Sequence, residues 1–154
     1  MSELMRLALV QAGRAVKEVY PYPGVGVVIA EKDRVVSLSF NDAPGKGRHA
    51  EIKALDEART RGADLRKCVL YTNLEPCVNL GLTESCVAAI LRADIREVHI
   101  AIEDPYHLVR GQGVETLKQA HIKVVVGEMK DEAAWQNKRY LERFCCHCGW
   151  PIVD

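Results

Sequence analysis

The chain has 154 residues, of which 48% are hydrophobic and 27% are charged, a balance typical of one globular domain with a single core. Lysine and arginine together number 21, as do aspartate and glutamate, and this neutrality disfavours a polymeric nucleic acid as partner. The chain contains no run of about 20 apolar residues that could cross a membrane. Its first residues lack the pattern of a signal peptide, so we expect a cytoplasmic protein without membrane contact.

The first part of the chain predicts a helix, a hairpin and a second helix. Residues 2–19 carry apolar side chains at helical spacing, and two prolines that follow them end the helix. The valine-rich run 24–30 and the run 35–40 are separated by a polar turn, which predicts a hairpin. Residues 41–48 contain proline and glycine and predict a loop, and residues 49–61 predict a helix.

The remainder of the chain alternates strands and helices. The expected elements are strands at 69–72, 97–102 and 122–126, and helices at 84–93, with Thr83 as N-cap, at 113–120 and at 132–144. Strands joined through helices should run parallel. We therefore predict a three-layer α/β/α fold, in which a mixed sheet of about five strands is flanked by helices. Residues 1–144 would form this domain, and residues 145–154 a tail packed on the domain or at a subunit interface.

One histidine and two cysteines predict a metal site. His49 begins a predicted helix, Cys77 follows a predicted strand, and Cys86 lies in the first turn of the next helix. Three such ligands leave a fourth position for water, which is typical of catalytic rather than structural zinc. The helix dipole should lower the pKa of Cys86 and favour its thiolate. The expected cofactor is Zn²⁺.

Glu51 is the candidate catalytic residue of this site. Two thiolates and a neutral imidazole cancel the charge of the metal, so such a site needs a separate base to remove a proton from water. Glu51 stands two residues after His49, in the first turn of the same predicted helix. A lone His-x-Glu motif carries little weight, but its combination with Pro76-Cys77 and a second cysteine at a helix start predicts catalysis.

The tripeptide His49-Ala50-Glu51 with Pro76-Cys77 resembles the zinc-dependent cytidine/deoxycytidylate deaminase superfamily. The resemblance implies a cytidine-deaminase-like fold and a hydrolase that cleaves a cyclic amidine C–N bond. Such an enzyme replaces an exocyclic amine with a carbonyl and releases ammonia. We therefore expect a small heterocyclic amine as substrate.

The spacing of the cysteines narrows the resemblance. Most members separate the two cysteines by two residues, whereas eight residues lie between them in segment 77–86. This spacing resembles the deaminase domain of the bifunctional deaminase–reductase of riboflavin biosynthesis. Segments 21–26, 104–113 and 132–141 resemble further parts of that domain. The best-matched substrate is therefore its diaminohydroxyphosphoribosylaminopyrimidine.

Three residues are candidates for substrate binding. The resemblance implies that the Ala50 backbone amide donates to a ring carbonyl. Asn41 can both donate and accept hydrogen bonds, although it could equally cap its loop. Tyr22 could stack on a ring, or be a structural tyrosine at the entry to a strand. Tyr22 and Asn41 stand where the riboflavin family tends to have asparagine and histidine, respectively, so these departures bear on the substrate.

Other functions stay open at this point. A salvage or secondary-metabolism deaminase of a free base or nucleoside, of the cytosine/cytidine or guanine type, would fit the asparagine at position 41. A transfer-RNA editing deaminase is disfavoured by the neutral charge and the long cysteine spacing. A non-catalytic zinc scaffold is disfavoured by Glu51, because a structural zinc does not use an unligated carboxylate. The resemblance also implies a homodimer or homotetramer.

The carboxyl-terminal tail concentrates soft metal ligands in a short tract, Cys145, Cys146, His147 and Cys148. Such tracts can bind metal, so a second metal site is one interpretation. Four adjacent ligands cannot easily all face one tetrahedral ion, so packing of the tail on the protein is the simpler interpretation.

Overall fold

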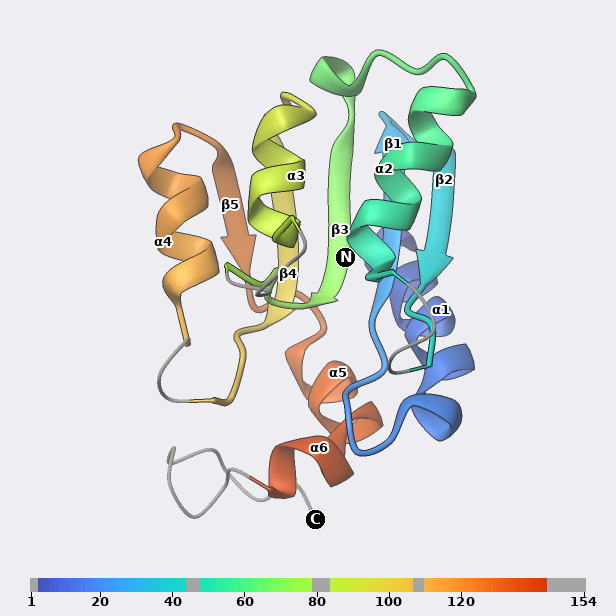
Figure 1. Ribbon diagram of the computed structural model, residues 1–154, viewed down its shortest axis with the longest axis vertical. Helices are drawn as coiled ribbons and strands as arrows, with labels where there is room; N and C mark the ends of the chain where they lie inside the picture. Colours follow the sequence, from blue (N-terminus) through green and yellow to red (C-terminus); the bar gives the residue numbers. More distant parts are fainter. Residues whose placement is uncertain (1–2, 44–47, 79–83, 107–109, 144–154) are drawn as a thin grey trace.

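A mixed β-sheet lies between two layers of helices (Figure 1). The computed structural model describes residues 3–43, 48–78, 84–106 and 110–143 of the chain. In chain order, the elements are α1 (Glu3–Val19), β1 (Gly26–Glu31), β2 (Arg34–Phe40), α2 (Ala50–Thr60), the 3-10 helix η1 (Leu65–Lys67), β3 (Val69–Leu74), α3 (Cys86–Arg92), β4 (Glu97–Ile102), α4 (Gln112–Gln119), β5 (Lys123–Val126), α5 (Lys130–Gln136) and α6 (Lys138–Glu142).

The sheet has five strands in the order β2-β1-β3-β4-β5. β1 runs antiparallel to both of its neighbours, whereas β3, β4 and β5 are parallel to one another. Residues 26–30 of β1 are apolar and buried on both faces, while the edge strand β2 contains buried, half-buried and exposed residues. The predicted mixed five-stranded α/β/α fold is confirmed.

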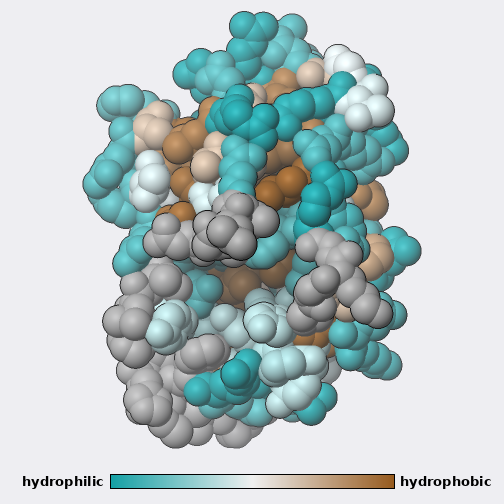
Figure 2. All heavy atoms as spheres, viewed as in Figure 1, coloured by the Kyte–Doolittle hydropathy of each residue, from teal (hydrophilic) through white to brown (hydrophobic). Residues whose placement is uncertain are grey.

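Each face of the sheet has its own hydrophobic core. α2, α3 and α4 pack on one face around residues such as Ile29, Leu70 and Ile100, and this face is toward the viewer in Figure 1. α1 and α5 cover the other face around residues such as Met5 and Val28. In Figure 2, hydrophilic side chains dominate the outer surface of the first face, with apolar side chains visible between them.

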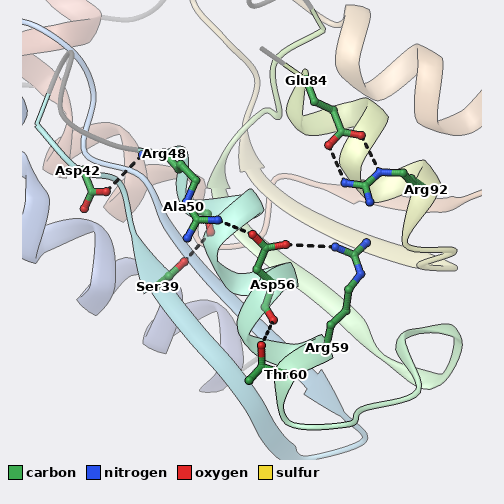
Figure 3. Close-up of polar contacts among 9 residues, drawn as sticks. All are labelled: Ser39, Asp42, Arg48, Ala50, Asp56, Arg59, Thr60, Glu84 and Arg92. Carbon is green, nitrogen blue, oxygen red and sulfur yellow. Dashed lines mark hydrogen bonds and ion pairs between the residues drawn. The ribbon is translucent and has the colours of Figure 1, made fainter.

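Two buried serines on β2 attach helix α2 to the sheet. The hydroxyl of Ser37 donates to the Ala54 carbonyl oxygen at 2.8 Å. The hydroxyl of Ser39 donates to the Ala50 carbonyl oxygen (Figure 3). Ala50 is the first residue of α2. These bonds therefore fix the start of α2, where His49 and Glu51 lie.

Two local predictions were wrong. α3 begins at Cys86, and its N-cap is Ser85, whose hydroxyl accepts from the Ala88 backbone amide at 3.0 Å; the expected cap, Thr83, lies outside the described residues. The helix predicted at 132–144 is two helices that meet at Asn137, which has a non-helical φ of −103°. The Asn137 side chain is bonded to the backbone of a distant segment, and local periodicity cannot reveal such a contact.

Within the described part of the chain, no helix combines the length and apolar character needed to cross a membrane.

Candidate metal centre and active site

The three predicted zinc ligands converge, although they come from three places in the sequence. His49 is the N-cap residue of α2, Cys77 follows β3, and Cys86 is the first residue of α3. Their ligand atoms all lie within 4.8 Å of one another. The Cys86 backbone amide donates to the Cys77 sulfur at 3.3 Å. The starts of two helices and the segment after β3 therefore hold a histidine and two cysteines around one point.

The donor atoms fit a zinc ion. The Nδ1 atom of His49 is 3.7 Å from the Cys77 sulfur and 3.3 Å from the Cys86 sulfur. Tetrahedral zinc, with Zn–S bonds of about 2.3 Å and Zn–N bonds of about 2.1 Å, separates such a nitrogen and sulfur by roughly 3.6 Å. One imidazole and two sulfurs are also a donor set that zinc prefers. The residues present can therefore hold the predicted ion.

The two thiols differ in their acidity. A hydrogen bond between them lowers the pKa of Cys77 to about 5 and raises the pKa of Cys86. Burial and the nearby Glu51 carboxylate raise the pKa of Cys86 further. The predicted effect of the helix dipole on Cys86 is thus wrong for the metal-free chain, because the thiol is buried beside negative charge. The same Cys77 sulfur raises the pKa of His49 through its hydrogen bond to the imidazole.

Glu51 is a buried carboxylate at the edge of this cluster. Its side chain is only 3% exposed, and Oε2 accepts from the Cys86 sulfur at 3.4 Å. Burial, reinforced by the negative charge of Cys77, raises the pKa of Glu51 to about 7. A carboxyl group with a pKa near neutrality can both take and give a proton at physiological pH.

A cavity of about 360 Å³ opens beside the cluster, a size suited to a small heterocycle. Its walls include His49, Glu51 and Cys77, together with all three predicted substrate-binding residues: Tyr22, Asn41 and Ala50. Tyr22 is 57% exposed, so its ring is available for stacking. Both polar atoms of Asn41 bond the backbone of residues 23 and 25, which leaves one amide hydrogen and one lone pair for a substrate.

Two further residues on the cavity wall, Asp104 and Tyr140, were missed as site residues in the sequence. The Tyr140 hydroxyl donates to Asp104 Oδ1 at 3.4 Å, and burial raises the pKa of both groups. Asp104 follows the carboxyl end of β4, which is a recognised position for binding residues in parallel sheets. Tyr140 lies on α6 and carries no comparable signal in the sequence.

Glu75 connects the ligand segment to the opposite side of the cavity. Its carboxylate is buried and accepts three backbone N–H bonds, from Asp104 at 2.8 Å, Gly111 at 3.0 Å and Val114 at 3.0 Å. A Cβ on Gly113 would lie 2.3 Å from the Pro76 carbonyl oxygen, so only glycine allows this close approach. The segment before Cys77 is thereby fixed to the start of α4.

The second predicted metal site, formed by Cys145, Cys146, His147 and Cys148, lies outside the described residues. The same is true of the predicted tail as a whole. Both stay predictions.

Comparison with known families accords with this geometry. Residues 1–102 match the model of the cytidine and deoxycytidylate deaminase zinc-binding region. The chain belongs to this family, and the predicted resemblance and zinc cofactor are confirmed.

Similar proteins include enzymes of riboflavin biosynthesis. The riboflavin biosynthesis protein RibD of Aquifex aeolicus is 38% identical over 137 residues, which are 89% of this chain and 37% of the relative. The diaminohydroxyphosphoribosylamino-pyrimidine deaminase of Buchnera aphidicola (subsp. Schizaphis graminum) is 36% identical over 123 residues, 80% of this chain and 81% of the relative.

A solved structure shows the same fold. The deaminase/reductase of Thermotoga maritima superposes with a TM-score of 0.87 at 32% identity, covering 93% of this chain and 40% of the other. This chain thus spans less than two fifths of the RibD relative's length and two fifths of the solved structure.

Proposed function

We propose that this chain is a zinc-dependent hydrolytic deaminase of the diaminopyrimidine precursor of riboflavin. The observation that carries the proposal is the juxtaposition of three zinc-type ligands with Glu51, a buried carboxylate that stands beside the ligand atoms. A purely structural zinc site has no use for such a group. The named relatives support the substrate, because one of them is a deaminase of this compound.

His49, Cys77 and Cys86 would hold the metal. The chemistry that zinc supplies in such sites is the activation of water for attack on the carbon that bears the amine. The two sulfurs and the imidazole leave one position free for that water. Glu51 lines the cavity, so a ring bound there would have its amine within reach of the carboxylate.

Glu51 would carry the protons. It accepts a proton from the attacking water and delivers it to a ring nitrogen, which makes the neighbouring carbon more electrophilic. It then takes the proton of the newly added hydroxyl and transfers it to the amine, so that the C–N bond breaks, ammonia leaves and the C–O bond becomes a carbonyl. A pKa of about 7 suits both directions of transfer, since the group is poised between its two forms.

The substrate contacts would come from Ala50, on the metal side of the cavity, and from residues on the opposite side. The Ala50 amide would donate to a ring carbonyl, Tyr22 would stack on the ring, and the remaining amide hydrogen of Asn41 would meet a polar edge. Asp104 and Tyr140 complete this side. A heterocycle that carries several N–H groups and a carbonyl would match these donors and acceptors.

The test is ammonia release by zinc-loaded protein over a panel of amino-heterocycles. The panel contains the diaminopyrimidine ribotide, its dephosphorylated form, cytosine, cytidine, guanine and adenine. We expect turnover of the ribotide, and a loss of about 10²–10⁴ in kcat for Glu51→Gln with one zinc per chain retained. Turnover of a free base alone would overturn the proposed substrate but support the proposed deamination. Silence across the panel would overturn the proposal.

The matched control is Glu57→Gln. Glu57 lies on the same helix as Glu51 and pairs with Arg61 at the surface, at 2.6 Å. It also exchanges a carboxylate for an amide, but its side chain does not line the cavity. We expect its kcat to stay within about twofold of the parent value. An equal loss in both variants would exclude a specific role for Glu51.

The proposed homodimer or homotetramer is a separate point. Only the family resemblance supports it, and sedimentation equilibrium of the whole chain would test it. A monomer at micromolar concentration would contradict it.

A further inference from the structure

The backbone of residues 23–26 is held by side-chain amides from distant parts of the chain. Asn41, which follows β2, supplies the first. Its Oδ1 accepts from the Val25 amide at 2.8 Å, and its Nδ2 donates to the Pro23 carbonyl oxygen at 3.0 Å. The Asn41 side chain thus makes the backbone bonds that a neighbouring strand would otherwise make with this segment.

Asn73 and Asn137 bond the same segment from other directions. Asn73 accepts from the Gly26 amide and donates to the Gly24 carbonyl oxygen, both at 2.9 Å. Asn137 accepts from the Gly24 amide at 2.9 Å and donates to the Gly24 carbonyl oxygen at 2.8 Å. Asn73 is 0% and Asn137 3% exposed. Both amides therefore satisfy buried backbone groups that regular secondary structure leaves unpaired.

The segment has little freedom on its remaining side. A Cβ on Gly24 would lie 2.5 Å from a Val16 side-chain carbon and 2.7 Å from the Ala12 carbonyl oxygen. α1 thus presses against Gly24 from one direction while the asparagines hold it from others. The flanking residues Tyr22, Pro23 and Val25 line the cavity beside the metal ligands. Whatever fixes Gly24 therefore fixes one wall of the cavity.

Asn73 and Asn137 both contradict the local preference of their positions. Asn73 occupies the interior of β3, where asparagine is disfavoured. Asn137 interrupts what would otherwise be one helix, between α5 and α6. Residues that violate local propensity in a well-packed protein are expected at functional sites, where another requirement outweighs the cost. Here that requirement is the position of the cavity wall.

We infer that Asn73 and Asn137 are positioning residues, which hold the wall formed by residues 22–25 at the distance that the substrate ring requires. The inference rests on the proposed function for its effect on turnover. It adds that α5 and α6 reach the active site through Asn137, over a separation of 113 residues in sequence. Neither residue needs to touch the substrate.

The kinetic test uses Asn137→Ala and Asn73→Ala in the zinc-loaded full chain. Loss of two hydrogen bonds should loosen the wall and raise KM for the substrate about tenfold. His49, Glu51 and Cys86 lie on other elements, and the segment between Asn73 and Cys77 is anchored by Glu75. We therefore expect kcat to stay within about threefold and zinc content not to change. A fall in kcat of about tenfold with an unchanged KM would overturn the positioning role, and so would loss of zinc.

The matched control is Gln136→Ala. Gln136 adjoins Asn137, and its Nε2 donates to the Leu9 carbonyl oxygen at 2.8 Å. The substitution removes an anchor between α5 and α1 that does not reach the cavity wall. We expect its KM within about twofold of the parent value. If the control raises KM as much as Asn137→Ala, general loosening explains the effect and the inference fails.

Hydrogen exchange gives a readout that does not need activity. The amides of Gly24, Val25 and Gly26 each donate to an asparagine oxygen, so a peptide covering residues 21–28 should be protected. Asn137→Ala should speed its exchange about tenfold or more, and Gln136→Ala should not. Unchanged exchange in the asparagine variants would overturn the inference, as would faster exchange with an unchanged KM.

Failure of the proposed function can be distinguished from failure of the positioning inference. If the parent protein deaminates nothing, the proposed function fails, while the exchange of residues 21–28 still decides whether the asparagines hold the segment. If both asparagine variants are unfolded by circular dichroism, the residues are structural and the inference is overturned.

Discussion

The two sides of the cavity are built in different ways. The metal side comes from residues 49–51 at the start of α2, from Cys77 after β3 and from Cys86 at the start of α3. The opposite side is assembled from Tyr22, Asn41, Asp104 and Tyr140, which belong to four separate parts of the chain. Both sides bring together residues that are distant in sequence, but two of the three metal ligands stand at helix starts, whereas the residues of the opposite side share no such local origin.

This difference separates chemistry from recognition. His49 and Cys86 stand at helix starts, and Ser37 and Ser39 of β2 fix the start of α2. The opposite side is positioned by buried amides such as Asn137, which bonds a segment 113 residues away. Substitutions in the core around α5 and α6 would thus alter the fit of the substrate without altering the reaction. Three substitutions would sharpen or break this comparison.

The largest loss of stability is expected for Glu75→Gln, because Glu75 joins the two sides. Its carboxylate accepts from the backbone amides of Asp104, Gly111 and Val114. An amide in its place weakens these bonds and turns a donor toward at least one N–H group. We expect the free energy of unfolding to fall by about 3 kcal/mol, measured by urea denaturation. A loss below about 0.5 kcal/mol, as for a surface change, would show that the sides are independent.

A second substitution, Glu51→Gln, should abolish most of the activity but raise the stability of the metal-free protein. The folded-state pKa of about 7 lies above the ordinary value of 4.5, so the folded protein binds the proton more tightly than the unfolded chain. The free energy of unfolding therefore falls as pH rises from about 4.5 to about 7, and stays low above that. The glutamine variant lacks this penalty.

Removal of the buried charge should stabilise the metal-free protein by about 3 kcal/mol above pH 7, and by almost nothing below about pH 4.5. Urea denaturation over this pH range, in the presence of a chelator, is the measurement. Equal stability of the two proteins at pH 8 would contradict the expectation and would indicate that Glu51 is well solvated without the metal.

The smallest effect is expected for Arg92→Gln. Arg92, the last residue of α3, donates two hydrogen bonds to the Glu84 carboxylate, at 2.8 and 2.7 Å (Figure 3). Glu84 lies just before the start of the same helix. Both side chains are exposed, at 59% and 36%, so solvent screens the pair. We expect a change below about 1 kcal/mol in thermal or urea unfolding. A larger change, or a fall in zinc content, would mean that the pair helps to orient Cys86.

Sequence patterns alone could predict most of the fold. The apolar run 26–30, the hairpin and the alternation of strands with helices identified the mixed sheet, because period and turn chemistry are local properties. The division of the last helix at Asn137 could not be predicted, since its cause is a bond to Gly24. The start of α3 was misplaced for a smaller reason, because Thr83 and Ser85 are both good N-cap residues and only the backbone decides between them.

The chemistry of the site was encoded in the sequence itself. His49, Glu51, Cys77 and Cys86 are residue types with few alternative uses at such spacing, although their convergence follows from the packing of α2 and α3 on the same face of the sheet. The tertiary structure alone decided the rest. It placed Tyr140 and Asp104 on the cavity wall, lowered the pKa of Cys77 and raised that of Cys86 through the hydrogen bond between them, and set Asn73 and Asn137 against the backbone of residues 23–26. These properties depend on which distant groups share a buried space, and no local pattern records that.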